Sequence, residues 1–255
     1  MAVHPASVAI LMFAFTFGGA LAGMKLRRIL PMEHLADESR STISVGTGLI
    51  ATITALVLGL VTASAKGAFD AANAGLRQVA SDLLVLDRNL ARFGPGAAEV
   101  RAQLKRLVEL RVSIVRRAGD ARGEALDPEV FSQHLEAFAR RVFDLRAESA
   151  YQEWLRDRAL ERIESLVEER WLTFGFRSSG VPAPFLVVLL FWLTFTFVSF
   201  GMFAPRNGTV AVVLLVCALS VASAVFLILE LDGPFQGWVQ VSAEPLVYAI
   251  SRLGR

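Results

Sequence analysis

The sequence predicts an all-α integral membrane protein, with four transmembrane helices in two hairpins and a central soluble helical bundle. The first observation is a stretch of about 25 residues without a charged side chain, between Arg40 and Lys66. Similar stretches lie between Arg177 and Arg206 and between Arg206 and Glu230. Each is long enough to cross a hydrocarbon core of roughly 30 Å as a helix.

The second observation is that the charge is concentrated in the middle of the chain. The whole sequence has 26 basic and 24 acidic residues, and counting residues 66–177 alone gives 19 basic and 18 acidic residues. This block is nearly neutral and has no patch of one sign, so its charge does not favour nucleic acid as a partner. The sequence therefore predicts the lipid bilayer as the surroundings of the chain and no nucleic-acid partner.

The first hairpin is expected within residues 1–65, with spans at about 7–24 and 43–65. The first apolar run is expected to be a transmembrane anchor rather than a cleaved signal peptide, because the basic residues Lys25, Arg27 and Arg28 follow it and none precedes it. Gly19 and Gly23 form a small-xxx-small pattern that allows another helix to approach closely. Such residues are also common in any membrane helix, so both interpretations stay open.

The second span carries a regular stripe of small side chains and several threonines. The stripe recurs every four residues and consists of Ala51, Ala55, Gly59 and Ala63. Thr47 and Thr54 are candidates for a polar path through the membrane. Their hydroxyls can also bond to carbonyls one turn earlier in the same helix, and this interpretation is favoured.

The central block, residues 66–177, is expected to be a bundle of short helices. Apolar residues recur in steps of three and four, which is typical of helices with one buried face. Gly94-Pro95-Gly96 and the segment 119–123 interrupt this pattern, and Asp127-Pro128 supplies an N-cap and a first-turn proline for the next helix.

The second hairpin is expected within residues 178–232, with spans at about 185–203 and 209–229. The short turn Pro205-Arg206-Asn207-Gly208 joins these spans, so they run antiparallel. Residues 233–255 are expected to form an amphipathic C-terminal tail.

Two acids, Glu230 and Asp232, lie at the end of the fourth span. An acid at a membrane boundary is costly unless it reaches water or a partner. In an oligomer these acids could form a ring at a pore mouth. They could instead mark where the helix leaves the membrane and bond to nearby arginines, which is the favoured interpretation.

The orientation of the chain in the membrane stays open. The basic cluster after the first span places that end in the cytoplasm and the central block outside. Counting the basic residues near the ends of all four spans weakens this preference.

No residue pattern points to catalysis. The histidines His4, His34 and His134 lie far apart, and Cys217 is the single cysteine. The sequence has no phosphate-binding loop, no nucleophile elbow and no zinc-ligand spacing. We therefore expect no enzyme activity, no cofactor and no metal site.

The C-terminal part of the chain contains a motif that is found in a known family. Its residues are Leu231, Asp232, Gly233, Pro234, Phe235 and Gly237, and Val241-Ser-Ala-Glu-Pro-Leu246 follows. With the stretches 55–60, 63–67, 86–88 and 93–95, the chain resembles the bacterial bestrophin-like domain family, which has no assigned function. A remote likeness to bestrophin anion channels implies a homo-oligomer with a central pore, and it places the helical block in the cytosol, against the charge pattern.

Two functions are therefore expected for a multi-pass protein of the cell membrane, namely the bacterial inner membrane. The first is an oligomeric ion channel or pore. The alternative is a non-conducting membrane scaffold or sensor whose soluble bundle binds a protein partner that the sequence does not identify.

Overall fold

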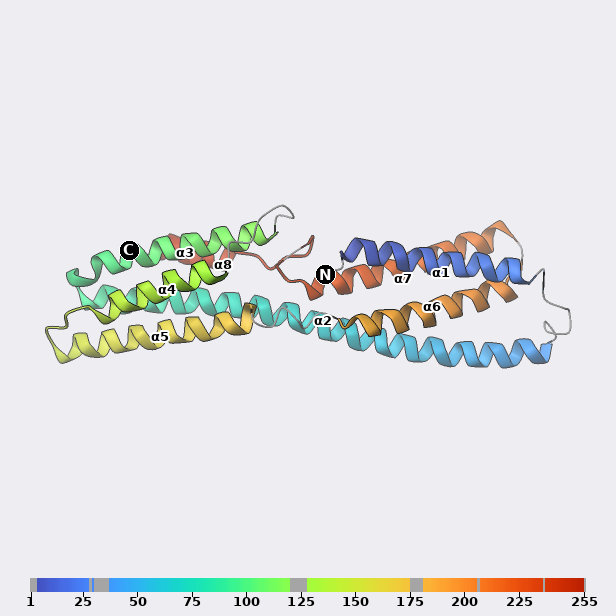
Figure 1. Cartoon of the computed structure of the whole chain (residues 1–255), viewed down its shortest axis with the longest axis horizontal. Helices are drawn as coiled ribbons and strands as arrows, with labels where there is room; N and C mark the ends of the chain where they lie inside the picture. The colour runs from blue at the N-terminus through green and yellow to red at the C-terminus, as the bar shows by residue number, and fades with distance from the viewer. Residues whose placement is uncertain are drawn as a thin grey trace. The chain divides into compact units, whose positions relative to one another are not determined.

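The computed structural model describes residues 4–27, 29, 37–119, 128–174, 181–205, 207–235 and 237–254. These ranges contain no β-strand, which confirms the all-α class. The helices are shown in Figure 1, and their bounds in chain order are α1 Pro5–Leu26, α2 Asp37–Phe93, the 3-10 turn η2 Pro95–Ala97, α3 Ala98–Gly119, α4 Pro128–Phe143, α5 Ala150–Phe174, α6 Ala183–Phe203, α7 Gly208–Asp232 and α8 Glu244–Arg252.

The chain divides into two compact units. The membrane unit comprises Met1–Gly67 and Gly180–Asp232, and the bundle unit comprises Ala68–Ser179 and Gly233–Arg255. Helix α2 runs without interruption from one unit into the other, over 57 residues. It contains no proline, and an isolated helical glycine costs only about 1 kcal/mol relative to alanine, so nothing in its sequence ends it before Phe93.

The breaks between helices follow the local sequence. Helix α2 ends at Phe93 because Gly94 takes a φ of 104°, a conformation that glycine adopts without steric cost, and Pro95 then starts the short turn η2. Helix α3 ends at Gly119 and α4 begins at Pro128, as expected. The expected N-cap Asp127 lies outside the described residues.

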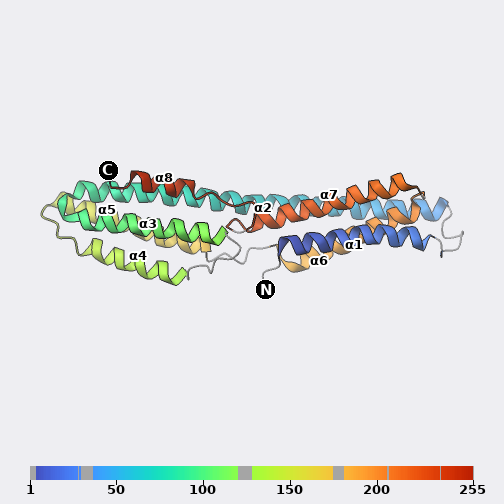
Figure 2. The ribbon, with the colours of Figure 1, turned by 90° about the horizontal axis from the view of Figure 1, so that it is seen from above.

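The core of the membrane unit is formed by α1, α6 and α7. Figures 1 and 2 show α1 running beside both of the other helices, and α1 contacts each of them. One of the clusters of buried side chains in this core consists of apolar residues from all three helices, with Val57 and Leu58 of α2 packed against them. They are Val8, Met12, Leu189, Leu193, Ala222 and Val225. Helix α1 thus packs against both α6 and α7.

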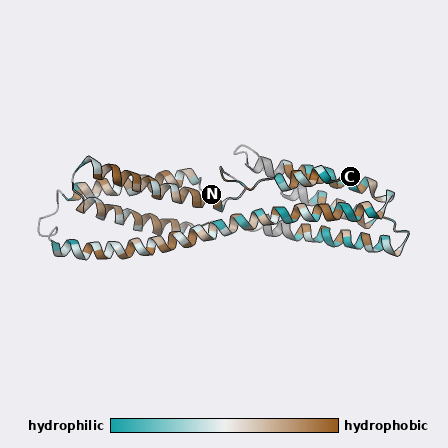
Figure 3. Ribbon diagram, turned by 180° about the vertical axis from the view of Figure 1, so that it is seen from behind, coloured by the Kyte–Doolittle hydropathy of each residue, from teal (hydrophilic) through white to brown (hydrophobic). Residues whose placement is uncertain are grey.

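In the described part of the chain, four helices are long and apolar enough to cross a membrane: α1, α2, α6 and α7. Helix α6 has 21 residues and is therefore about 31 Å long, which matches the thickness of a hydrocarbon core. Figure 3 shows that α1, α6 and α7 consist of hydrophobic residues over most of their length, whereas the helices of the bundle unit alternate between hydrophobic and hydrophilic residues.

The bundle unit has one hydrophobic core, to which α2, α3, α4, α5 and α8 all contribute. Phe138 of α4 and Leu155 of α5 are almost fully buried in it, as is Leu86 of α2. The C-terminal residues expected to form a tail also belong to this core, because Leu246 and Ala249 of α8 are completely buried. Helix α8 therefore closes the bundle as a structural element.

Candidate functional site: the membrane unit and its two boundaries

Helices α1 and α6 pack unusually closely, because three of the positions where they meet are glycines. A Cβ atom built on Gly23 would overlap the backbone carbonyl of Val198, and one built on Gly201 would overlap that of Ala20. A Cβ on Gly19 would lie 3.2 Å from both the backbone oxygen and the methyl group of Thr194. The two helices run parallel, because higher residue numbers in α1 meet higher residue numbers in α6. Gly19 and Gly23 therefore face α6 where the two helices approach closely.

The buried hydroxyl groups of this unit mostly bond within their own helices. The Thr54 hydroxyl donates to the carbonyl of Ile50 at 2.7 Å, and that of Thr16 donates to the carbonyl of Met12 at 2.7 Å. These bonds satisfy a polar group in apolar surroundings without a partner helix. Among the described residues, the buried hydroxyls of Thr47 and Thr196 are exceptions, with no hydrogen-bond partner.

The structure places Thr47 and Thr54 on the side of α2 that is covered by its own chain. They are 4% and 5% exposed, respectively. The other side of α2 is open and carries three members of the small-residue stripe, Ala55, Gly59 and Ala63, while Ala51 is half-buried at its edge. Ala55, Gly59 and Ala63 therefore lie on a different face from the two threonines, whereas Ala51 lies one helical turn from each of them.

The open face of α2 also carries hydroxyl groups that bond one turn back. Thr52 donates to the carbonyl of Gly48 at 2.9 Å, and Thr62 donates to that of Leu58 at 2.7 Å. Both side chains are exposed. A hydroxyl that donates in this way still has lone pairs that accept hydrogen bonds from water or from a neighbouring chain.

One boundary of the membrane unit is marked by arginines at the C-terminal end of α6. Arg27, just after α1, donates from Nη1 to the carbonyl of Ala204 at 2.7 Å. Arg40 of α2 places its guanidinium 6.0 Å from the centre of the Phe203 ring. Two cations from different helices therefore meet consecutive residues at the end of α6, where unsatisfied carbonyls and the helix dipole favour positive charge.

The opposite boundary is marked by the acids that the sequence singled out. A side-chain oxygen of Asp232, the last residue of α7, accepts a hydrogen bond from the backbone N–H of Val181 at 3.0 Å. This bond ties the end of α7 to the start of α6. Glu230 lies in the last turn of α7 and is 4% exposed within the single chain. Among the described residues, the hydrogen bond of Asp232 is with backbone rather than with an arginine.

The residues of the family-like motif fall at the junction after this boundary. Leu231 and Asp232 complete α7, and Gly233, Pro234 and Phe235 follow as a turn. The N–H of Val241 donates to the carbonyl of Pro234 at 2.8 Å, which closes a loop. Gly237 has a φ of 90° within this loop, so its backbone conformation is one that favours glycine.

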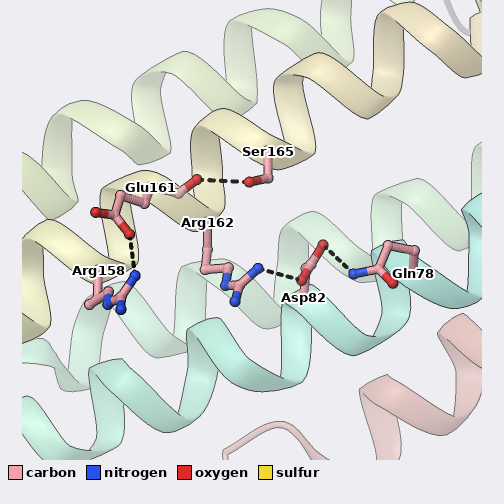
Figure 4. A network of polar contacts seen from close by, with 6 residues as sticks. All are labelled: Gln78, Asp82, Arg158, Glu161, Arg162 and Ser165. Atoms are coloured by element: carbon pink, nitrogen blue, oxygen red, sulfur yellow. Dashed lines mark hydrogen bonds and ion pairs between the residues drawn. The ribbon is translucent and has the colours of Figure 1, made fainter.

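Buried carboxylates of α2 in the bundle unit are held by hydrogen bonds to residues of the same helix and of α3 and α5. Asp82 of α2 accepts from Arg162 of α5 at 3.2 Å and from Gln78 at 3.2 Å (Figure 4). Asp87 accepts two bonds from Arg101, at 2.9 and 3.0 Å. The hydrogen bond to Asp87 raises the pKa of Arg101 above its ordinary value, against the opposing effect of burial.

The bundle unit also exposes aromatic side chains where α4 ends and α5 begins. Phe143 is 67% exposed, Tyr151 is 55% exposed and Trp154 is 51% exposed. The rings of Tyr151 and Trp154 stack with their centroids 6.0 Å apart. Exposed aromatic groups of this kind are typical of surfaces that contact another molecule.

The predicted site residues thus occupy separate places in the structure. Gly19 and Gly23 lie in a helix contact, and Thr47 and Thr54 lie on the covered side of α2. Ala55, Gly59 and Ala63 lie on its open side, and Glu230 and Asp232 lie at one boundary. Sequence reasoning did not single out Arg27 and Arg40 as a pair, although the basic cluster after the first span was a signal. Among the described residues, no group of three or more His, Cys, Asp or Glu side chains is placed to hold a metal ion.

The long apolar helices and the bundle unit define a multi-pass helical membrane protein. A family model for the Bestrophin-like domain matches residues 13–246, which is most of the chain. The protein therefore belongs to the Bestrophin-like domain family, as the C-terminal motif indicated.

Solved structures show the same fold. Two crystal structures of a bacterial Bestrophin homolog from Klebsiella pneumoniae, each of a single-residue mutant, match with TM-scores of 0.66 and 0.67. Each is 14% identical in sequence and covers 96% of this chain and 97% of its own. A further crystal structure of the Klebsiella pneumoniae homolog matches with a TM-score of 0.64 at 14% identity, over 95% of this chain and 96% of that one. No curated protein sequence matches this chain.

Proposed function

We propose that this protein is the subunit of a homo-oligomeric ion channel or pore in the bacterial inner membrane. The observation that carries the proposal is the open face of α2. Within the most apolar 18-residue stretch of each helix, only 11% is buried in α2, against 33% in α6 and 28% in α1 and α7. Helix α2 is thus the membrane-crossing element that its own chain covers least.

The composition of this open face favours protein or water rather than lipid as its neighbour. Ala55, Gly59 and Ala63 provide a smooth surface, and such residues are enriched where membrane helices meet. Thr52 and Thr62 add hydroxyl groups that can face a water-filled path. The arrangement is consistent with several copies of α2 surrounding a common axis, as the likeness to bestrophin anion channels implies.

The first test is the size of the particle and its conductance. We expect the purified protein in mild detergent to be an oligomer, and we expect this oligomer to conduct ions in planar bilayers. A monomer, or a correctly assembled oligomer without current, would contradict the channel.

A matched pair of variants tests the role of the α2 face. Gly59→Leu places a large side chain on it, so we expect loss of the oligomer or of the current. Gly18→Leu is the control, because Gly18 in α1, like Gly59, has no atom of its own chain within 4 Å of a built Cβ. Equal effects of both variants on assembly and current would argue against α2 as the contact helix.

The boundary acid Glu230 can be tested in the same assay. Because Glu230 is buried within the single chain, its position supports a structural role at the end of α7. We therefore expect Glu230→Gln to leave the reversal potential unchanged in an ion gradient. A shifted reversal potential would instead assign Glu230 to the conduction path.

A non-conducting scaffold or sensor is the alternative, and the exposed aromatic residues Phe143, Tyr151 and Trp154 favour it. A surface of this kind in the bundle unit could bind a partner protein. This alternative predicts an assembled particle that conducts no ions and a partner that is lost on Trp154→Ala.

A further inference from the structure

The charges of the membrane unit are distributed unequally between its two boundaries. At the end where α1 and α6 terminate, the described basic residues are Lys25, Arg27 and Arg40, and the first two residues of α2, Asp37 and Glu38, are acidic. At the opposite end lie the acids Glu230 and Asp232 and the single basic residue Lys66 of α2, among the described residues of the unit. The two ends are separated by the length of α6, about 31 Å, so the basic end lies at the level of one row of phospholipid headgroups.

The two arginines at this end keep most of their hydrogen-bonding capacity. A guanidinium has five N–H donors, and Arg27 uses one of them on the carbonyl of Ala204. Arg40 contacts the ring of Phe203, and an arginine over a ring face keeps its in-plane donors available. Both side chains are exposed. The arginines also meet consecutive residues, Phe203 and Ala204, so they converge on the same end of α6.

We propose that Arg27 and Arg40, with Lys25 beside them, bind the phosphate of an anionic phospholipid at this boundary of the membrane unit. Guanidinium groups suit phosphate because their fork of donors can contact two oxygens at once. Phe203 supplies an apolar surface next to the charged groups, as aromatic residues do at the headgroup level. A basic residue near an anionic membrane surface raises affinity roughly fivefold, so the two arginines together account for roughly 25-fold.

The test measures lipid binding by the purified full-length protein in mild detergent. The probes are phosphatidylglycerol and phosphatidylcholine with the same acyl chains, and inorganic phosphate as the free anion. The readouts are bound lipid, counted by native mass spectrometry, and the shift of the thermal unfolding midpoint. We expect phosphatidylglycerol to bind and stabilise the protein more than phosphatidylcholine, and inorganic phosphate to have no comparable effect.

The variant Arg27→Gln/Arg40→Gln is expected to lose the preference for phosphatidylglycerol, with affinity reduced roughly 25-fold. Arg252→Gln is the matched control, because Arg252 also lies over an aromatic ring, 5.4 Å from the centre of Tyr248, but in the bundle unit. It should keep the preference. If the double variant is too unstable to purify, Arg40→Gln alone should still lose about fivefold, because it leaves the Arg27 hydrogen bond intact.

Three results would overturn the proposal. They are equal binding of the two lipids to the native protein, an unchanged preference in the arginine variants, and an equal loss in Arg252→Gln. Stabilisation by inorganic phosphate to the same extent would replace the lipid with a free anion as the ligand. None of these readouts depends on ion conduction, so the proposal stands or falls separately from the channel.

Discussion

At the scale of single residues, the packing of the membrane unit depends on glycines at positions where a larger residue would not fit. Gly23 and Gly201 each face a backbone carbonyl of the opposite helix, so α1 and α6 approach until their backbones touch. Without a hydrophobic effect between helices in lipid, such close packing is a main source of their association. Gly18, one position before Gly19, faces open space and makes no such contribution.

Gly23→Ala is therefore expected to destabilise the protein, because the new Cβ forces α1 away from the Val198 carbonyl. Overpacking of this kind costs about 1–3 kcal/mol. Gly18→Ala is the control and should be neutral or stabilising by up to about 1 kcal/mol, because it only reduces the conformational entropy of the unfolded chain. Unfolding in mixed detergent measures both. Similar stabilities for the two variants would show that the α1–α6 contact is looser in solution.

At the scale of elements, α8 shows how the C-terminus joins the bundle unit. Leu246 and Ala249 are completely buried, and the N–H of Gly254 donates to a side-chain oxygen of Asp87 at 3.3 Å. Asp87 also pairs with Arg101, so one buried carboxylate connects α2, α3 and the C-terminal residues. The amphipathic pattern of residues 244–252 is thus explained by the protein core.

Leu246→Ala should lower the free energy of unfolding by about 2–5 kcal/mol, as expected when a buried leucine leaves a cavity. Val247→Ala, at a neighbouring position that is 37% exposed, should cost much less. A urea titration in detergent, followed by tryptophan fluorescence, measures the difference. If α8 instead associated with lipid, the exposed position would be the more sensitive of the two.

At the scale of the whole molecule, the protein combines an apolar unit with a charged one, and helix α2 contributes residues to both. The four long apolar helices bury little of their surface within one chain. Lipid or further copies of the chain must therefore cover them, because apolar surface left in water costs roughly 25 cal/mol per Å².

We accordingly expect the protein to stay with the membrane fraction after an alkaline carbonate wash and to dissolve only in detergent. Immunoblots of the pellet and the supernatant measure this. Recovery of compact protein in the supernatant without detergent would contradict the membrane assignment and the proposals built on it.

The spans, the helix breaks and the all-α class could be predicted because they depend on local features. A charge-free stretch of about 25 residues specifies a crossing wherever it occurs, and Gly94-Pro95-Gly96 ends a helix through its own backbone preferences. The resemblance to the family could also be recognised from the sequence, because it rests on a short motif. The small-xxx-small pair Gly19 and Gly23 was predicted as one of two interpretations, because composition alone does not show what a glycine faces.

Only the tertiary structure decided which faces are covered and which remain open. It placed Thr47 and Thr54 against the protein's own helices, left Ala55, Gly59 and Ala63 uncovered, and brought Arg27 and Arg40 to one end of α6. The contacts of Arg27 with Ala204 and of Arg40 with Phe203 join residues that are more than a hundred positions apart. Helical periodicity identifies residues that share a face, but a residue's neighbour across that face is set by the packing of the whole unit.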